Sequence, residues 1–302
     1  MVRRALTRPN RLDMAFPNVR WLEQPSVSSQ VAPALRFDNV SVSFDDRPAL
    51  ARVSFELPAG ETRVVFGAGG SGKTVLMKAA IGLIRPESGH VYLFGRDITT
   101  LTEEELDSWR PHAGVLFQEG GLFDSLTVAE NVAFPLVNQR DRKPSESEVE
   151  SRVREALAFV GLAHVMEKYP SELSGGMRRR VGIARAAVTR PPLLLYDSPT
   201  AGLDPITAYH IMVLLIRQRD TRNEAAMVVT YRRQDGHLMA NFMYDPSTGK
   251  LQRSDNVRRG TKFLVLRQGR VVFEGSQSEL QASTDPYVSK FAKKPESVQT
   301  RS

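Results

Sequence analysis

The sequence predicts an α/β fold with a mainly parallel sheet, because short buried-type strands alternate with segments of helical periodicity. RVVF, Arg63 to Phe66, is a short apolar strand that leads directly into a glycine-rich loop. TVLMKAAIGLI, residues 74–84, follows that loop with the apolar spacing of a packed helix. Three further buried-type strands are expected at 114–117, 193–196 and 227–230.

Composition limits the class of protein. The chain has 302 residues, of which 41% are hydrophobic and 25% charged, an ordinary balance for a globular protein with a packed core. It has no apolar run of about 18 residues and no apolar block near its arginine-rich start, so we expect a cytoplasmic protein without a membrane span or secretory signal. The absence of cysteine excludes disulfides, thiol catalysis and cysteine-ligated metals. A net charge of +7 is compatible with nucleotides, nucleic acid or a membrane surface and does not choose among them.

The first part of the chain divides into two segments. Residues 1–34 carry five arginines with several prolines and serines and show no sustained period, which predicts a basic, flexible N-terminal extension. From Leu35, LRFDNVSVSF alternates apolar and polar residues, and ARVSFELPAG (51–60) repeats the alternation. This pattern predicts an antiparallel β subdomain before the parallel core.

Helical signals are concentrated between about 98 and 172. Thr102 and Glu105 have the spacing of a capping box, which marks a helix start. Val149, Val153 and Leu157 fall on one face of a helix within 145–161. We therefore expect a helical subdomain inserted into the α/β core.

The glycine-rich loop GAGGSGKT fits the pattern G-x-x-x-x-G-K-[ST] and lies between a predicted strand and a predicted helix, the context that this motif needs. Its glycines let successive N–H groups point at phosphate oxygens, toward which the helix directs its positive end. Lys73 is expected to reach the β and γ phosphates, and Thr74 to ligate Mg²⁺. The expected contacts to ATP in this loop are Gly67, Ala68, Gly69, Gly70, Ser71, Gly72, Lys73 and Thr74.

LSGGM, Leu173 to Met177, opens an arginine-rich helix, and LLLYD (193–197) follows it. The order and spacing of these motifs and the phosphate loop resemble the ATP-binding cassette, or ABC, family of P-loop ATPases. The resemblance covers residues 35–292 and leaves 293–302 as a C-terminal tail. It implies an ABC cassette with a parallel-sheet core, an antiparallel β subdomain and an inserted helical subdomain.

The resemblance implies roles for single residues in binding MgATP. Phe44 would stack on adenine, with a position in the core of its strand as the alternative. Gln118 would reach Mg²⁺ and the attacking water, with a surface glutamine as the alternative. Asp197 would hold Mg²⁺ through water, so the implied metal set is Thr74, Gln118 and Asp197.

Other residues imply a dimer of ATPase subunits. Ser174, Gly175 and Gly176 form the signature, which such ATPases present to the γ-phosphate bound in a second subunit. Asp204 would pack across the dimer interface, although it also fits a simple helix cap. The resemblance leaves a homodimer and a heterodimer open.

Three further stretches resemble the ATPase subunits of Mla-type transporters, which act with MCE proteins on phospholipids: LFDSLTVAENVAFPL (122–136), DPIT (204–207) and TDPYVSKF (284–291). They imply a lipid-transporting permease and an MCE-type protein as partners, and a place at the inner face of the membrane. Residues 120–136 lie where ABC ATPases bind the coupling helix of the permease. Leu122 and Phe123 are therefore expected to contact that helix, with local packing as the alternative. Action on nucleic acid is not expected, because the chain carries a single cassette.

Two positions depart from the family pattern. Ser198 stands where the family has the glutamate that polarises the attacking water, and Tyr231 stands where it has a histidine. Loss of a positioned base costs about 10²- to 10⁴-fold in rate, so the sequence predicts ATP binding with slow hydrolysis. Glu119, Asp204 or a residue of a partner could replace the missing base. The alternatives are a nucleotide-sensing module and the degenerate half of a heterodimer, neither of which would hydrolyse ATP at this site.

The chain is also longer than the family pattern after Tyr231. NFMYDPSTGKLQRSDNVRRG has a strong turn signal between two strand-like arms, which predicts an extra β-hairpin at about 241–260. A partner-docking element and a tolerated surface insertion both fit this hairpin. The sequence gives neither the cargo nor its direction of transport.

Overall fold

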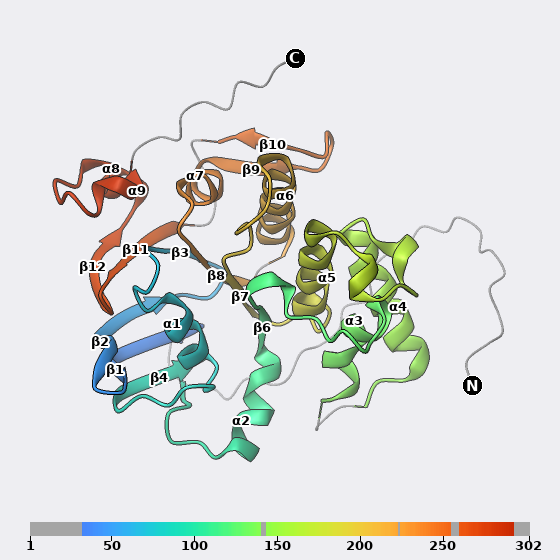
Figure 1. Ribbon diagram of the computed structural model, residues 1–302, viewed down its shortest axis with the longest axis horizontal. Helices are drawn as coiled ribbons and strands as arrows, with labels where there is room; N and C mark the ends of the chain where they lie inside the picture. Colours follow the sequence, from blue (N-terminus) through green and yellow to red (C-terminus); the bar gives the residue numbers. More distant parts are fainter. Residues whose placement is uncertain (1–31, 140–142, 223, 255–259, 293–302) are drawn as a thin grey trace. The chain divides into compact units, whose positions relative to one another are not determined.

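The computed structural model describes residues 32–139, 143–222, 224–254 and 260–292 (Figure 1). Most of the expected N-terminal extension, the whole C-terminal tail and the last part of the expected insertion lie outside the described residues. No helix within the described ranges is long and apolar enough to cross a membrane.

A six-stranded sheet forms the centre of the described chain, in the order β12-β11-β3-β8-β7-β6. All neighbours are parallel except β12, which pairs antiparallel with β11. β3, β7 and β8 are buried along their whole length, as expected for parallel strands covered on both faces. The expected parallel-sheet core is confirmed. The strands are β3 (Thr62–Gly67), β6 (Ala113–Leu116), β7 (Leu193–Asp197), β8 (Ala225–Thr230), β11 (Thr261–Arg267) and β12 (Arg270–Gly275).

A second sheet is antiparallel and has the order β2-β1-β4-β5. Its first two strands are those predicted from alternation, and the other two have no counterpart in the sequence prediction. The bounds are β1 (Leu35–Phe44), β2 (Arg47–Leu57), β4 (Ser88–Leu93) and β5 (Arg96–Asp97).

Two hydrophobic cores lie on opposite faces of the parallel sheet, because alternate residues of each strand point to opposite sides. Val65 joins the core shared with the antiparallel sheet and helix α1 (Lys73–Ala80). Val64 and Phe66 join the other core, which also contains residues of α6 (Pro205–Thr221).

Three helices pack on one another between β6 and β7: α3 (Val128–Val137), α4 (Glu146–Phe159) and α5 (Gly175–Ala187). The range 98–172 expected for a helical subdomain also contains α2 (Glu103–Trp109) and the sheet strand β6. We therefore propose that this subdomain consists of α3, α4 and the start of α5. Short 3₁₀ turns lie at Arg110–His112, Gln118–Gly120, Ala163–Val165 and Pro170–Glu172.

A two-stranded antiparallel hairpin, β9 (Phe242–Asp245) and β10 (Lys250–Arg253), follows α7 (Arg233–Asn241). Asp245 accepts hydrogen bonds from both hydroxyls of its turn, Ser247 and Thr248. Tyr244 and Leu251 pack against the core, which fixes the hairpin on the domain. The described chain ends with α8 (Gln277–Ala282) and α9 (Ser289–Ala292).

A buried glycine in α7 gives a stability prediction. A Cβ on Gly236 would lie 2.4 Å from Cζ of Phe66, whose ring is stacked between Phe263 and Phe291 at 5.7 and 5.1 Å between centroids. Alanine gains up to about 1 kcal/mol of helix propensity, but overpacking costs about 1–3 kcal/mol. We expect Gly236→Ala to lower the free energy of unfolding, measured in urea without nucleotide.

Gly175→Ala is the matched control for that measurement, because its Cβ would meet only a leucine methyl group at 4.0 Å. We expect it to change the free energy of unfolding by less than about 0.5 kcal/mol. Equal or greater stability of Gly236→Ala would show that the Phe66 ring yields and that the packing argument is wrong.

Candidate functional site

The glycine-rich loop connects the end of β3 to the start of α1. Gly70 and Gly72 have φ of 72° and 101°, in the left-handed region that favours glycine. A Cβ on Gly67 would lie 2.2 Å from Oγ of Ser71, so the loop closes too tightly for a larger residue there. This compact curl at a helix N-terminus fits a phosphate group.

Lys73 lies in the mouth of this loop. Its Nζ donates to the carbonyl oxygens of Gly67 and Ala68, at 2.8 and 2.7 Å, and to Oγ of Ser71 at 3.2 Å. Burial lowers the pKa of Lys73, and the negative charge of Asp197 partly opposes that shift. The ammonium is thus fixed beside the loop backbone, where a phosphate oxygen would be a stronger, charged acceptor.

Thr74 and Asp197 meet across the site, although 123 positions separate them. Oγ1 of Thr74 donates to Oδ2 of Asp197 at 3.2 Å, and the carboxylate is only 4% exposed at the C-terminal end of β7. A hydroxyl beside a carboxylate is a donor set that suits Mg²⁺. Gln118 lies exposed in the turn after β6, and within the described ranges no hydrogen bond joins it to Thr74 or Asp197.

Ser198 is held from several sides. Its N–H donates to the Val229 carbonyl at 2.8 Å, and its own carbonyl accepts from Nη1 of Arg179 at 3.1 Å. Its φ of 49° lies in the left-handed region, and its Oγ donates to Oδ1 of Asp197 at 3.0 Å. The hydroxyl is therefore engaged with the neighbouring carboxylate, and a hydroxyl is no general base near neutral pH.

Tyr231 directly follows β8, the strand next to β7, so it lies at the same sheet edge as Ser198. Its side chain is 53% exposed. Of the alternative bases considered from the sequence, Asp204 is occupied as the N-cap of α6, and the Glu119 side chain lies outside the part of the chain that the structure describes.

A buried carboxylate connects these two segments and was missed by sequence reasoning. Oδ2 of Asp235 accepts from Oγ1 of Thr200 at 2.6 Å and from Oγ1 of Thr230 at 2.7 Å. Burial raises the pKa of Asp235, which is only 1% exposed, while the two threonine hydrogen bonds partly oppose the shift. Asp235 therefore ties the loop after Asp197 to the segment that carries Tyr231.

The remaining expected residues lie at the surface. Phe44 is 50% exposed at the end of β1, so the alternative of a core position is wrong. Oγ of Ser174 accepts from the Met177 N–H as the N-cap of α5, where Gly175 and Gly176 form the first turn. Asp204 accepts from the N–H groups of Ile206 and Thr207, each at 3.0 Å, which matches the helix-cap alternative and lowers its pKa. A cap position also leaves Asp204 exposed for contact with a second chain.

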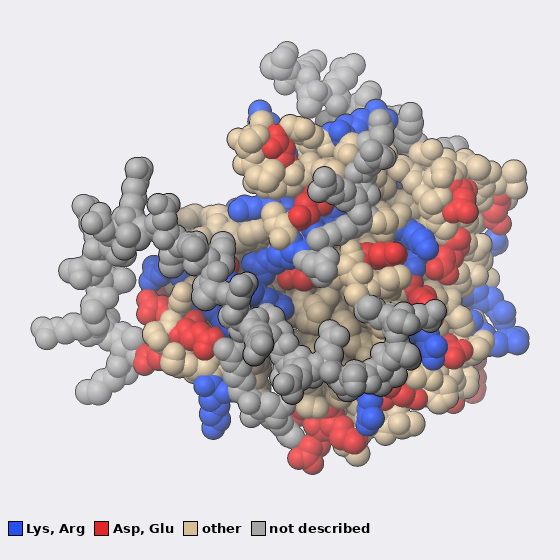
Figure 2. Space-filling view, turned by 180° about the vertical axis from the view of Figure 1, so that it is seen from behind, with Lys and Arg blue, Asp and Glu red and all other residues tan. Residues whose placement is uncertain are grey.

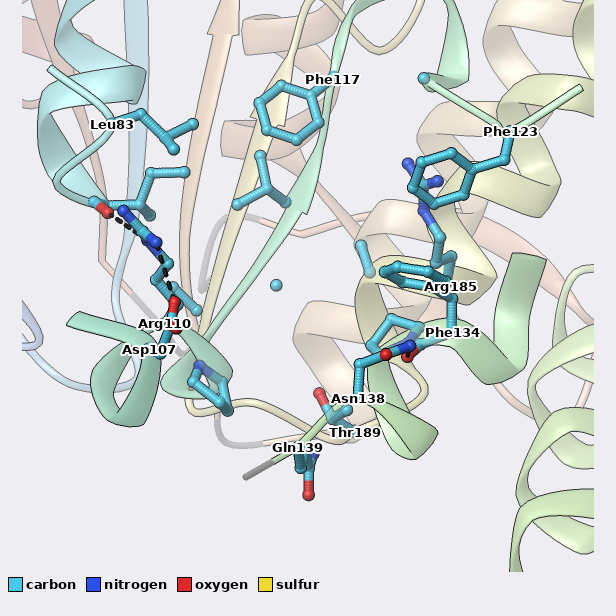
Figure 3. Close-up of a pocket in the computed structure, with 18 residues that line it drawn as sticks. Leu83, Asp107, Arg110, Phe117, Phe123, Phe134, Asn138, Gln139, Arg185 and Thr189 are labelled. Carbon is cyan, nitrogen blue, oxygen red and sulfur yellow. Dashed lines mark hydrogen bonds and ion pairs between the residues drawn. The ribbon is translucent and has the colours of Figure 1, made fainter. Parts of the chain in front are cut away.

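An apolar groove of about 640 Å³ lies away from the phosphate loop (Figure 3). Figure 3 shows Leu83 and Arg110 on one side and Phe123 and Phe134 on the other, with the two phenylalanine rings 4.7 Å apart. Phe123 is 43% exposed, whereas Leu122 packs against the core. For these two residues the local-packing alternative therefore holds for Leu122 alone.

Asn131 fixes the wall of this groove. It is fully buried, accepts from the N–H of Phe123 at 2.8 Å, and donates to the carbonyls of Phe123, Leu126 and Thr127, each at 3.0 Å. The loop that presents Phe123 is thus held in one conformation.

Comparisons with known proteins agree with this arrangement. The protein family described as "ABC transporter" matches residues 50–201, which contain the phosphate loop, the signature and Asp197. The chain belongs to the ABC transporter family. A probable ribonucleotide transport ATP-binding protein, mkl, of Mycobacterium tuberculosis (strain H37Rv) is 39% identical, over 70% of this chain and 59% of the relative. The chain thus spans less than two thirds of the length of this relative.

Two other relatives carry different names. The protein TRIGALACTOSYLDIACYLGLYCEROL 3, chloroplastic, of Arabidopsis thaliana is 37% identical over 84% of this chain and 72% of its own length. A methionine import ATP-binding protein of Bifidobacterium longum is 37% identical over 74% of this chain and 57% of its own. Among solved structures, the ATP-binding cassette MJ0796, as a dimer bound to ADP and Pi, aligns with a TM-score of 0.68 and 28% identity over 80% of this chain and 98% of that one. The ABC cassette fold predicted from the sequence is confirmed.

The Asp235 network predicts a pH dependence of stability. Because the pKa of Asp235 is raised in the folded state, the folded chain binds this proton more tightly than the unfolded chain does. The free energy of unfolding should therefore fall as the pH rises from the usual aspartate range through the raised pKa. Native protein should lose stability relative to Asp235→Asn over this range, measured by urea unfolding from about pH 4 to about pH 8.

Asp38→Asn is the control, because Asp38 is an exposed aspartate whose pKa is not raised. A difference between native protein and Asp235→Asn that stays constant with pH would contradict the assignment.

Proposed function

We propose that this chain is the ATP-binding subunit of an ABC transporter, that it binds MgATP at the loop Gly67–Thr74, and that it hydrolyses ATP slowly. Lys73 would hold the β and γ phosphates, and Thr74, Asp197 and Gln118 would hold Mg²⁺, which neutralises phosphate charge when bound. Phe44, exposed at the end of β1, would stack on adenine. Ser174, Gly175, Gly176 and Asp204 would complete the site of a second ATPase subunit.

The observation that carries the slow-hydrolysis proposal is the hydrogen bond from Oγ of Ser198 to Oδ1 of Asp197 at 3.0 Å. At this position the chain offers the attacking water neither a carboxylate nor a free hydroxyl. Tyr231 adds a phenol where the family has a histidine, and it carries no positive charge toward the γ-phosphate. We expect positioning and electrostatic stabilisation to leave a residual rate.

Two related functions differ in how the missing base is handled. A nucleotide-sensing module would stay closed on ATP, and a degenerate half of a heterodimer would rely on a related subunit for a complete site. The pairing of Ser198 with Asp197 favours both over an enzyme that is fast by itself. The ATPase measurement below separates the three.

We propose the groove of Figure 3 as the contact with a membrane permease, which would place the chain at the cytoplasmic face of the membrane. Exposed apolar side chains on a fixed wall suit an apolar helix surface. Figure 2 supports a protein partner over nucleic acid, because basic and acidic side chains are interspersed on the described part of the face it shows.

For the cargo we propose a phospholipid, taken up with an MCE-type protein. The support is the likeness of 122–136, 204–207 and 284–291 to Mla-type ATPases, together with a relative named for a galactolipid. Other relatives are named for ribonucleotide and methionine transport. Reconstitution of the subunit with its permease should therefore move labelled phospholipid and neither methionine nor ribonucleotides.

Steady-state ATPase activity tests the role of Ser198. We expect native protein alone to turn over slowly and Ser198→Glu to raise the rate about 10²-fold or more, since a positioned base is worth that much. Lys73→Ala should abolish activity and is the control for contaminating ATPases. The assay is run with and without the permease.

Three results would be informative. Native activity equal to Lys73→Ala, restored by Ser198→Glu, would identify a sensing module or a heterodimer half. Activity that appears only with a second ATPase subunit would identify the heterodimer. Fast native turnover abolished by Lys73→Ala would contradict the proposed effect of Ser198.

The groove gives a separate prediction. Replacing both Phe123 and Phe134 by alanine should reduce the amount of subunit retained by permease-containing membranes about 10-fold or more, because aromatic anchors dominate such contacts. Val272→Ala removes another exposed apolar side chain, 42% exposed on β12, and should have little effect. Equal retention of both variants would rule out the groove as the contact.

A further inference from the structure

The end of the described chain returns to the phosphate loop. Tyr287 donates its O–H to the Leu266 carbonyl at 3.0 Å, and the same oxygen accepts the N–H of Ala68 at 3.0 Å. Ala68 is the second residue of the loop, 219 positions earlier in the chain. One phenol thus joins the end of β11 to the loop that follows β3.

Packing and hydrogen bonds fix the ring of Tyr287. Phe291 meets it edge-on with centroids 5.5 Å apart, and the Arg267 guanidinium lies 5.2 Å from its centroid. Asp285 accepts from the N–H groups of Tyr287 and Val288, at 2.7 and 2.9 Å. Val288 is only 1% exposed and anchors the segment in the core. The hydroxyl is therefore presented by a built support and not by a mobile tail.

The contact leads directly to the phosphate-binding lysine. Ala68 uses its N–H toward Tyr287 and its carbonyl toward Nζ of Lys73, at 2.7 Å. The next residues, Gly69 and Gly70, have no atom within 4 Å of an added Cβ, so packing does not constrain them. Ala68 is thus a point at which the exposed side of the loop is tied to the rest of the domain.

We propose that Tyr287 is a positioning residue of the nucleotide site, which holds Ala68 so that the phosphate loop and Lys73 are preorganised for a polyphosphate. This proposal rests on the proposed binding of ATP by the same loop. Loss of the hydroxyl leaves the Ala68 N–H without this partner and lets the loop sample other conformations, so binding must then supply the ordering. One hydrogen bond of this kind corresponds to about a 3- to 10-fold change in affinity.

Tyr287→Phe tests the proposal in the full chain, because it removes only the hydroxyl and keeps the ring packing. We expect the dissociation constant for MgATP, measured by calorimetry, to rise about 3- to 10-fold. Inorganic tripolyphosphate, used as a competitor, should lose affinity by the same factor, because the effect acts on the phosphate loop and not on adenine. The thermal midpoint without nucleotide reports any general loss of structure.

Two variants serve as controls. Tyr209→Phe removes a hydroxyl from an exposed tyrosine on α6 and should leave both affinities unchanged. Phe291→Leu disturbs the support of the ring without removing the hydroxyl, and should lower the thermal midpoint together with the affinity.

The outcomes are distinguishable. If native protein shows no saturable MgATP binding, the proposed function fails as well. If native protein binds MgATP and Tyr287→Phe binds it equally well, only the role of Tyr287 is overturned. If ATP affinity falls while tripolyphosphate affinity does not, positioning of the phosphate loop is also overturned.

Discussion

The parallel register of β3, β8 and β7 is the constraint on which the site depends. These strands are buried on both faces, so their alternating side chains must satisfy two cores at once, and a slip of one residue would reverse every side chain. Phe66 lies beside Thr230, and Asp197 beside Val229, so all three strands end at one edge of the sheet. The phosphate loop, Asp197 and the segment of Tyr231 meet there because the strands cannot pair in another way.

Polar groups behind that edge make the catalytic layer rigid. Arg179 reaches from α5 to the carbonyls of Ser198 and Ala201, each at 3.1 Å, and Asp235 joins the loop after β7 to the end of β8. The signature helix, the metal-binding carboxylate and the position of the missing base are thereby coupled in one network. In such a network Ser198 is held by its backbone, and its chemistry depends on the side chain alone.

Much of this arrangement follows from the sequence, because its signals are local. Alternation in 35–44 and the apolar run before GAGGSGKT determine strands, and the glycines at 70 and 72 determine a left-handed loop. Contacts between distant segments could not be predicted. Asp235 is one acidic residue on an ordinary helix until Thr200 and Thr230 surround it, and Tyr287 reaches Ala68 only through the register of β11 with β3. The limits of the helical subdomain were also misjudged from helix density, because β6 belongs to the sheet.

The central claim is that this subunit binds MgATP in a closed dimer and retains it, because the site lacks a positioned base. The most direct test is to load native protein with MgATP, follow its molar mass by light scattering for about an hour, far longer than an ordinary catalytic turnover, and identify the bound nucleotide. The account predicts a persistent dimer that contains intact ATP. A monomer that contains ADP at the same time point would contradict it.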